Sequence, residues 1–221
     1  MKIKNIVAVF AHPDDEAFGP SGTLALLAKE YNVYLLCATK GEAGAGGKNA
    51  GNIREGELLN SAKILGIKAV HFLGFADGTL CNNVYHKFAS AIKPYLEKYK
   101  PERVITFEML GVSGHIDHIT VSMVVTFLFE KLKYIKEVWY FCNNKSFRKF
   151  VPDYFIYFPE GYDRDKVDKI VDVTSVWDTK VASAKAHVSQ KHDFDMIYKI
   201  FKLLNKLHLF KKEELFLVKK R

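Results

Sequence analysis

Short apolar runs alternate with longer amphipathic segments along the first 133 residues of the chain. The runs are rich in β-branched residues, as buried strands are, whereas the segments between them repeat apolar residues at helical spacing. The expected strands span residues 3–10, 33–38, 69–75 and 103–107, and the expected helices span residues 22–31, 54–66, 84–99 and 119–133. Gly66 is typical of a helix C-terminus, and Pro94 is expected to bend or interrupt its helix. This order favours a doubly wound α/β fold, a mostly parallel sheet flanked by helices.

The part of the chain after residue 133 gives weaker signals. The near-alternating stretch DYFIYF at residues 153–158 is typical of a strand that completes the sheet. The aromatic and basic segment 134–158 could instead line a sugar site or contact a lipid surface. Residues 191–221 predict an amphipathic helix and a short terminal strand. Because no repeat or linker interrupts the chain, we expect a single domain over residues 1–221, with a core of residues 1–190.

Composition and charge narrow the class of protein. The chain has 221 residues, 48% of them hydrophobic, which is enough to bury a substantial core. Its net charge of +8 results from 33 Lys and Arg against 25 Asp and Glu, and lysine supplies most of the excess. Lysines favour a solvated surface that attracts anions weakly, and they lack the bidentate base recognition of arginine. We therefore expect no nucleic-acid partner, and an anionic substrate or membrane surface is the alternative to a merely solvated surface.

Targeting signals and a disulfide framework are not indicated. The longest apolar stretches fall short of the roughly 20 residues of a membrane span, and the first apolar run meets carboxylates too early for a signal peptide. Cys37, Cys81 and Cys142 lie far apart and form no C-x-x-C motif. We therefore expect a soluble protein of the reducing cytoplasm without membrane association. A homo-oligomer is compatible with the sequence, which leaves the oligomeric state open.

The residues suited to catalysis lie in loops that follow the expected strands. The stretch AHPDDE at residues 11–16 follows the first strand, and the loops at residues 39–52, 74–80 and 108–118 follow the next three. In open α/β sheets, ligands bind beyond the carboxyl ends of the strands. These loops are therefore expected to form one rim and to hold the active site.

Two motifs on this rim suit a metal ion. His12 and Asp15 offer a nitrogen and an oxygen across a turn stiffened by proline, and HIDH at residues 115–118 supplies two histidines from a different loop. Two histidines and one carboxylate are typical of a catalytic zinc site, because three protein ligands leave a fourth position for water. Asp14 is then free to accept a proton from that water. The pattern predicts metal-assisted hydrolysis.

Each motif alone also has a structural interpretation. HPDD could form a turn whose carboxylates cap a helix, and HIDH could begin a helix with Asp117 at its positive end. Because both motifs are expected at the same rim, a shared metal site is favoured over two separate structural roles. The glycine-rich stretch at residues 41–51 fits neither a P-loop nor a dinucleotide motif, so we interpret it as a mobile loop over the pocket.

With these motifs the chain resembles the PIG-L / LmbE-like family of zinc-dependent N-acetylglucosaminyl deacetylases. AHPDDE and HIDH are the main matches, and further matches are REGELLNSAKILG at residues 54–66, LGFADGTL at residues 73–80 and AHVSQ at residues 186–190. The likeness extends to about residue 190. Ile116 stands where the family usually has proline, which affects only the rigidity of the turn.

The resemblance implies a Rossmann-like fold and a set of residue roles. The implied zinc ligands are His12, Asp15 and His118. Asp14 would be the general base, and His115 would be the acid or electrostatic stabiliser near the scissile carbonyl, its imidazole held by Asp117. A neighbouring Asp117 would raise the pKa of this imidazole and favour its cationic form. The implied reaction is hydrolysis of an acetamide on an amino sugar, which releases acetate and a free amine.

Further positions match the family at sites that could bind substrate. Arg54 could pair with a phosphate or carboxylate of the substrate, or form a surface ion pair with Glu55 or Glu57. His187 and Gln190 lie three residues apart and could reach the sugar or the acetate. Asp77 could stabilise the turn in which it lies or contact the bound substrate. The metal could be iron, cobalt or manganese instead of zinc, since these also bind two histidines and a carboxylate.

Three classes of function therefore stand at this stage. The first is a metal-dependent deacetylase of a small-molecule amino-sugar conjugate. The second is a hydrolase of another amide or ester with the same residues, and the third is a sugar-binding module without catalysis. No motif selects the group attached to the sugar, although the net positive charge favours an anionic one.

Overall fold

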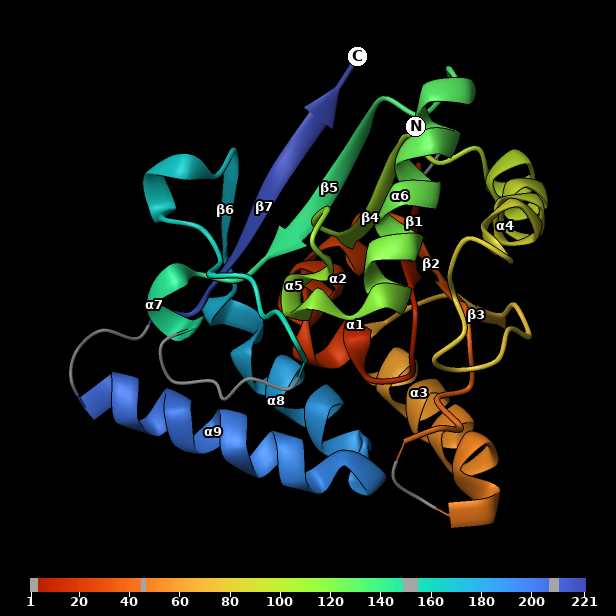
Figure 1. Ribbon diagram of the computed structural model, residues 1–221. Coiled ribbons are helices and arrows are strands. Elements are labelled where there is room, and N and C mark those ends of the chain that lie inside the picture. The colour runs from red at the N-terminus through yellow and green to blue at the C-terminus, as the bar shows by residue number, and fades with distance from the viewer. Residues whose placement is uncertain (1–3, 45–46, 149–154, 207–210) are drawn as a thin grey trace.

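A seven-stranded sheet with the order β3-β2-β1-β4-β5-β7-β6 forms the centre of the computed structural model, which describes residues 4–44, 47–148, 155–206 and 211–221 (Figure 1). The strands are β1 (Asn5–Phe10), β2 (Asn32–Cys37), β3 (Ala69–Phe72), β4 (Arg103–Phe107), β5 (Glu137–Cys142), β6 (Lys169–Asp172) and β7 (Glu213–Lys220). Strands β1 to β5 are parallel, β7 is antiparallel to β5, and β6 is antiparallel to β7. The predicted mostly parallel sheet is confirmed.

Helices cover both faces of this sheet (Figure 1). They are α1 (Asp15–Phe18), α2 (Ser21–Ala28), α3 (Ala50–Leu65), α4 (Tyr85–Tyr99), α5 (Gly111–Gly114), α6 (Ile116–Lys131), α7 (Lys145–Arg148), α8 (Trp177–Ala186) and α9 (Lys191–Lys206), with short 3₁₀ turns at Gly47–Asn49, Arg164–Lys166, Thr174–Val176 and Val188–Gln190. Gly66 ends α3 with a φ of 75°, as expected for a glycine C-cap. Helix α4 continues through Pro94, so the proline does not end it.

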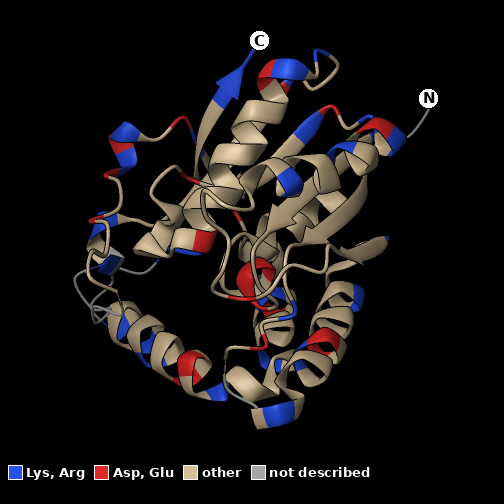
Figure 2. Cartoon of the chain, turned by 45° about the vertical axis from the view of Figure 1, so that its right-hand side comes forward, with Lys and Arg blue, Asp and Glu red and all other residues tan. Residues whose placement is uncertain are grey.

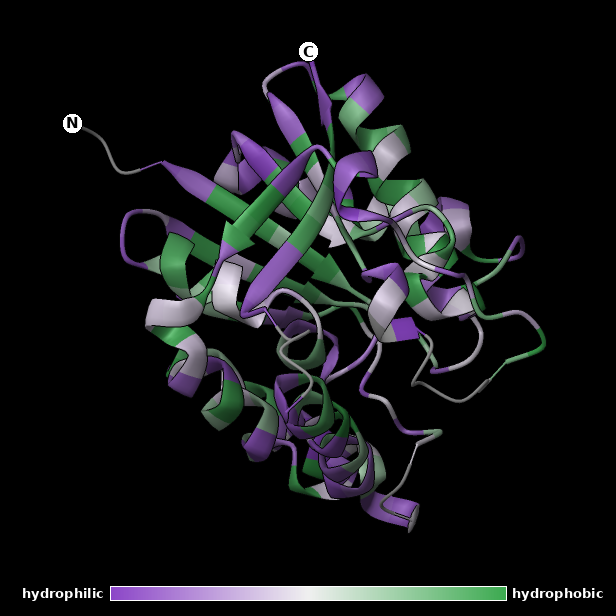
Figure 3. Ribbon diagram, turned by 90° about the vertical axis from the view of Figure 1, so that its left-hand side faces the viewer, coloured by the Kyte–Doolittle hydropathy of each residue, from purple (hydrophilic) through white to green (hydrophobic). Residues whose placement is uncertain are grey.

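The core lies between the sheet and its helices, and the strand residues supply most of it. Residues 6–10 of β1 and 33–37 of β2 are all buried, because both faces of the central strands are covered by helices. Figure 3 shows the strands as mainly hydrophobic, and Figure 2 shows the charged residues mostly on helices and loops around them. Among the described helices, none is long and apolar enough to cross a bilayer.

The C-terminal part of the chain is integrated into the sheet. The predicted amphipathic helix and terminal strand are confirmed as α9 and β7, and β7 lies between β5 and β6 in the sheet. The strand expected at residues 153–158 is wrong for its described part. Residues 155–158 form no strand, and β6 and β7 complete the sheet. Residues 153 and 154 lie outside the described part of the chain. The division into a core of residues 1–190 and a C-terminal segment of residues 191–221 stays a prediction.

The sheet order places the predicted rim. Strand β1 pairs with β2 on one side and β4 on the other, so the chain reverses its direction of winding at β1. A crevice forms at such a switch point, beyond the carboxyl ends of the strands. The loop after β1 and the loop after β4 meet at this point, and these loops contain the AHPDDE and HIDH motifs.

Candidate metal centre and active site

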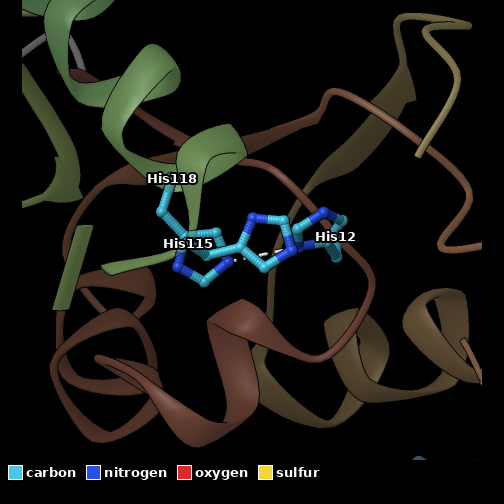
Figure 4. A group of neighbouring side chains, drawn as sticks. All are labelled: His12, His115 and His118. Carbon is cyan, nitrogen blue, oxygen red and sulfur yellow. Dashed lines mark hydrogen bonds between the residues drawn. The ribbon is translucent and has the colours of Figure 1, made fainter. Parts of the chain in front are cut away.

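Three side chains from the two motifs converge at the carboxyl ends of β1 and β4. His12 follows β1, Asp15 is the first residue of α1, and His118 lies in the first turn of α6. His12 Nδ1 lies 3.2 Å from His118 Nε2, and His118 Nε2 lies 3.2 Å from Asp15 Oδ1 (Figure 4 draws the three histidines of the site). Asp15 Oδ2 lies 3.7 Å from His12 Nδ1. The structure therefore brings together the three residues that the sequence predicts as metal ligands.

Hydrogen bonds on the far side of each side chain fix which atom faces this space. His118 Nδ1 donates to the carbonyl of Gly111 at 3.0 Å, which leaves the lone pair on Nε2. His12 Nε2 lies 2.9 Å from Asp77 Oδ1 and 3.1 Å from Asp117 Oδ2, both acceptors, so Nε2 carries a proton and, in the neutral ring, Nδ1 has the lone pair. The backbone N–H groups of residues 11 and 12 both donate to Asp15 Oδ2, which leaves Oδ1 toward His118.

A divalent cation fits this arrangement. Ligand atoms about 2.0–2.2 Å from a tetrahedral ion lie roughly 3.4 Å apart, close to the 3.2 Å that separates His118 Nε2 from His12 Nδ1 and from Asp15 Oδ1. The 3.2 Å between His12 Nδ1 and His118 Nε2 suits either a shared proton or a metal ion that both nitrogens bind. Although burial lowers the pKa of His12, its hydrogen bonds to Asp117 and Asp77 outweigh burial and raise the pKa to about 10. The site therefore favours positive charge.

Among the described residues, two sets of three side chains, neither of which includes Asp15, have ligand atoms within 4.8 Å of one another. His12, His115 and His118 form one, and His12, Asp77 and Asp117 form the other. In the second set, Asp117 already accepts hydrogen bonds from the backbone of Gly78 and Leu80. We therefore interpret its carboxylate as a support for His12, in keeping with the usual carboxylate behind a ligating histidine.

The backbone of Asp14 adopts a conformation that few side chains tolerate. Its φ is 109° and its ψ is −23°, a region unfavourable for a residue other than glycine. Arg54 Nη2 donates to Asp14 Oδ2 at 3.0 Å, and the backbone N–H of Asp14 donates to Glu16 Oε2 at 3.1 Å. Burial and the neighbouring Asp15 raise the pKa of Asp14 to about 7. A carboxyl group with such a pKa suits a general base near neutral pH.

Arg54 is buried beneath the site and makes neither of the surface ion pairs considered from sequence. Its Nη1 donates to the carbonyl of Gly41 at 2.8 Å, and its Nη2 also donates to the carbonyl of Pro13 at 2.7 Å. A Cβ atom at Gly41 would lie only 2.5 Å from the guanidinium carbon, so glycine lets the loop approach closely. Arg54 thereby joins the loops after β1 and β2 and borders the pocket.

The expected contact between the carboxylate of Asp117 and the imidazole of His115 is wrong. The carboxylate of Asp117 turns toward His12, and only its backbone N–H donates to His115 Nδ1, at 3.1 Å. The reason is that His115 caps the N-terminus of α6, while the side chain of Asp117 points back under the loop at residues 78–80. The pKa of His115 is also lowered, to about 4, by burial and by the neighbouring His118 and His12. The expected cationic imidazole is thus not favoured.

His187 and Gln190 lie in different surroundings. His187 is buried, and its Nε2 lies 2.7 Å from Glu16 Oε1, which also accepts from the hydroxyl of Ser61. Gln190 borders the pocket. The carboxylate of Glu16 therefore holds both the backbone N–H of Asp14, through Oε2, and the ring of His187, through Oε1.

Sequence reasoning gave Asp77 too little weight. Asp77 Oδ1 contacts His12, and its Oδ2 accepts from the backbone N–H of Ala43, so it links the metal site to the glycine-rich loop. The signal was its place in a loop after a strand on the same rim. Aspartate is common in turns such as ADG, so its presence there gave no reason to expect a long-range contact with His12.

We expect Asp77→Asn to weaken metal binding by about 10- to 100-fold while the protein stays folded, because an amide orients the His12 tautomer less well than a carboxylate. The measurement is the dissociation constant for Zn²⁺ by competition with a chromophoric chelator. Asp165→Asn, on an exposed side chain, is the matched control. Unchanged affinity in Asp77→Asn would show that Asp77 does not support the ligand.

A cavity of about 650 Å³ opens on the candidate metal site. His12, Asp14, Asp15, His115 and His118 form part of its wall. The cavity is within the usual size range of a small-molecule site. A metal site, a base and a substrate-sized cavity thus occur together at the switch point of the sheet.

Fold and site define a doubly wound α/β protein with a His₂Asp candidate metal centre at the sheet edge. A family model described as "PIG-L: GlcNAc-PI de-N-acetylase" matches residues 7–128, more than half of the chain. The chain belongs to this family.

Individual relatives cover different shares of the chain. "Probable N-acetyl-alpha-D-glucosaminyl L-malate deacetylase 2" of Bacillus cereus is 35% identical over 113 residues, which are 47% of this chain and 51% of that protein. The chain thus matches about half the length of this relative. "1D-myo-inositol 2-acetamido-2-deoxy-alpha-D-glucopyranoside deacetylase" of Mycobacterium sp. (strain JLS) is 26% identical over 234 residues, covering 85% of this chain and 74% of that protein.

Among solved structures, N,N'-diacetylchitobiose deacetylase from Pyrococcus horikoshii superposes with a TM-score of 0.70 at 19% identity. The match covers 98% of this chain and 84% of that chain. At this identity the likeness establishes the shared fold, and the chemistry has to be argued from the site.

Proposed function

We propose that the protein is a metal-dependent deacetylase that hydrolyses the acetamide of an N-acetylglucosamine conjugate. One observation carries this proposal: His118 Nε2 lies 3.2 Å from both His12 Nδ1 and Asp15 Oδ1, beside Asp14 and at the wall of a substrate-sized cavity. The names of both relatives and membership of the family support the choice of an acetamide on glucosamine as the substrate.

His12, Asp15 and His118 are the proposed ligands, and zinc is the proposed metal. Iron, cobalt and manganese stay alternatives because the same ligand set accepts them. When bound, the metal would polarise the acetamide carbonyl and make water more acidic.

The proposed chemistry of the chain begins at Asp14. Its carboxylate accepts a proton from water as the water oxygen attacks the carbonyl carbon. The proton then passes from Asp14 to the amide nitrogen, the C–N bond breaks, and acetate and the free amine are released. Arg54 holds the Asp14 carboxylate at 3.0 Å, so it positions the base. This hydrogen bond and the strained backbone keep the carboxylate in place before the substrate binds.

His115 is the proposed donor to the developing oxyanion. The backbone N–H of Asp117 donates to its Nδ1, so the neutral ring carries its proton on Nε2. A neutral imidazole in this tautomer can donate a hydrogen bond without first gaining a proton. We therefore assign electrostatic stabilisation to His115, and protonation of the leaving amine to Asp14.

Gln190 and Arg54 both border the cavity, and Gln190 is the better placed to contact substrate because the guanidinium of Arg54 is already bonded to the chain. Arg54 and His187 are retained as proposals with an indirect role. Both side chains already form hydrogen bonds within the protein, Arg54 with the loop after β1 and His187 with Glu16.

The test combines bound metal with acetate release. The purified chain is analysed for metal content and incubated with the methyl glycoside of N-acetylglucosamine, and acetate is measured enzymatically. We expect about one metal ion per chain and acetate release that stops when a chelator removes the metal. Acetate release that survives complete metal removal would contradict the proposal, as would a metal-loaded protein that releases none.

His115→Ala should lower kcat by about 10²- to 10³-fold, the usual loss when one donor to an oxyanion is removed. Metal content should stay the same, because His115 is not a proposed ligand. His86→Ala, an exposed histidine on α4, is the control. A variant that loses its metal together with its activity would move His115 into the ligand set.

A further inference from the structure

A buried carboxylate directly after β4 takes no part in the proposed deacetylation step. Glu108 is the first residue beyond the carboxyl end of this strand, and it is 1% exposed. Its Oε1 accepts from the backbone N–H of Val112 at 2.7 Å, and its Oε2 accepts from the backbone N–H of Leu110 at 2.8 Å and from the hydroxyl of Tyr162 at 3.3 Å. Burial of a carboxylate is unfavourable unless hydrogen bonds compensate for the lost water. The carboxylate therefore holds the turn at residues 110–112 from inside the protein.

This turn has a strained backbone. Val112 has a φ of 65° and a ψ of −47°, a conformation that a β-branched residue rarely adopts. Gly111 before it has a φ of 71°, which glycine tolerates. A strained conformation persists only where the surrounding contacts determine it. The two hydrogen bonds of the Glu108 carboxylate flank Gly111, and the backbone N–H of Gly111 donates to the carbonyl of Glu108 at 2.8 Å. Glu108 thus fixes the turn around Gly111.

The carbonyl of Gly111 lies behind the candidate ligand His118. It accepts from His118 Nδ1 at 3.0 Å, and a Cβ atom at Gly111 would lie only 2.8 Å from His118 Cβ. Phe107 stacks on the same imidazole, with ring centroids 4.1 Å apart. Figure 4 shows the His118 ring directed from α6 toward His12. A half-turn of the ring would keep the stack on Phe107 but would break the hydrogen bond to Gly111. The carbonyl of Gly111 therefore determines which edge of the ring faces the metal site.

We propose that Glu108 is a positioning residue for His118. Its carboxylate holds the strained turn, the turn presents the carbonyl of Gly111, and that carbonyl keeps His118 Nε2 directed toward the other two ligands. The role rests on the proposed metal site, because it links Glu108 to the affinity for the metal. Two simpler roles are the alternatives: a carboxylate that only stabilises the fold, and a negative charge that attracts the cation from a distance.

Glu108→Gln keeps the shape of the side chain and removes one acceptor. Whichever way the amide turns, its NH₂ group faces one of the two backbone N–H groups, so one of the two hydrogen bonds is lost. We expect the dissociation constant for Zn²⁺ to rise about tenfold, the lower end of the usual effect of groups that support a ligand. The measurement is competition with a chromophoric chelator on the folded protein. An unchanged dissociation constant in folded Glu108→Gln would overturn the proposal.

Val112→Gly separates positioning from charge. Glycine adopts a positive φ without strain, so the turn in this variant no longer depends on the carboxylate. When Glu108→Gln is introduced into Val112→Gly, its effect on the dissociation constant should therefore shrink from about tenfold to about twofold or less. A missing charge would weaken binding by the same factor with valine or glycine at this position. Equal factors in the two backgrounds would overturn the proposal.

Glu214→Gln is the matched control for loss of a buried carboxylate. Glu214 of β7 also accepts from two backbone N–H groups, those of Gly22 and Thr23, and from Lys180 Nζ, so it joins β7 to α2 and α8. Glu214→Gln should lower the melting temperature at least as much as Glu108→Gln and leave the affinity for Zn²⁺ unchanged. If both variants lost affinity in proportion to melting temperature, Glu108 would only stabilise the fold, and the proposal would be overturned.

The absorption spectrum of the Co²⁺-loaded protein reports on ligand geometry. Its d–d bands should shift in Glu108→Gln, return toward the parent in the double variant with Val112→Gly, and match the parent in Glu214→Gln. If Glu108→Gln does not fold, Glu108→Asp replaces it, because aspartate keeps the charge but is one CH₂ too short to reach both N–H groups. Glu108→Asp should also bind Zn²⁺ more weakly, and parental affinity in this variant would overturn the proposal.

Affinity and spectrum are measured without turnover, so they separate failure of this role from failure of the proposed function. If the parent binds Zn²⁺ and Glu108→Gln binds it more weakly while neither releases acetate, the positioning role stands and deacetylation falls. If the parent releases acetate in a metal-dependent way and Glu108→Gln binds Zn²⁺ with parental affinity, the positioning role is overturned and deacetylation stands. A parent protein that binds no metal would contradict both.

Discussion

Asp14→Asn is expected to lower kcat by about 10²- to 10⁴-fold with the metal still bound, the range for loss of a general base. The amide cannot accept the proton of the attacking water, whereas His12, Asp15 and His118 keep their contacts with each other. Because Arg54 can still donate to an amide oxygen at this position, the buried guanidinium keeps a partner. The measurement is the steady-state rate of acetate release together with metal content.

Two observations separate loss of the base from loss of structure. Asp165→Asn, on an exposed side chain, should retain the parent rate. KM for the methyl glycoside should change far less than kcat in Asp14→Asn, because the base acts in the transition state. If Asp14→Asn hydrolysed the acetamide at the parent rate, another group would have to be the base.

The sequence predicted the sheet and the positions of the ligands because both depend on local patterns. Apolar strands that alternate with helices specify a parallel sheet, and parallel strands bring their carboxyl ends to one edge. His12 and His118 therefore had to lie near each other once their loops were placed after β1 and β4. Their contact at 3.2 Å, across 106 positions of the chain, follows from topology.

The contacts behind the ligands could not be predicted because they depend on side-chain directions. Asp117 is two residues from His115 in sequence, which suggested that the two side chains would interact. In the folded chain, the start of α6 turns the Asp117 carboxylate to His12 instead. The position of β7 was hidden for a similar reason. Its pairing with β5 brings together residues far apart in the chain, and no local pattern of residues encodes that choice.

The positive φ of Asp14 depends both on the local AHPDDE motif and on contacts with residues distant in sequence. A strained backbone persists only where the surrounding contacts determine it, and here Arg54 holds the side chain while Glu16 holds the backbone N–H. Glu16 is itself bonded to His187 and Ser61. The AHPDDE motif therefore specifies more than a ligand set: its last carboxylate supports the conformation of the proposed base.

His118→Ala is expected to lose the metal and to lower kcat/KM by about 10³-fold or more, since polarisation by a metal supplies several kcal/mol and each 1.36 kcal/mol is tenfold in rate. Alanine leaves His12 Nδ1 and Asp15 Oδ1 as the only two proposed ligand atoms, which is too few for a catalytic zinc site. A chelator should lower the melting temperature of the parent and leave that of His118→Ala unchanged, because only the parent gains stability from bound metal. His86→Ala is the control for removal of a histidine, and comparison with His115→Ala decides which histidine of the HIDH motif is a ligand. If His118→Ala kept its metal and His115→Ala lost it, His115 instead of His118 would be the ligand that the HIDH motif supplies, and the proposed ligand set would be wrong.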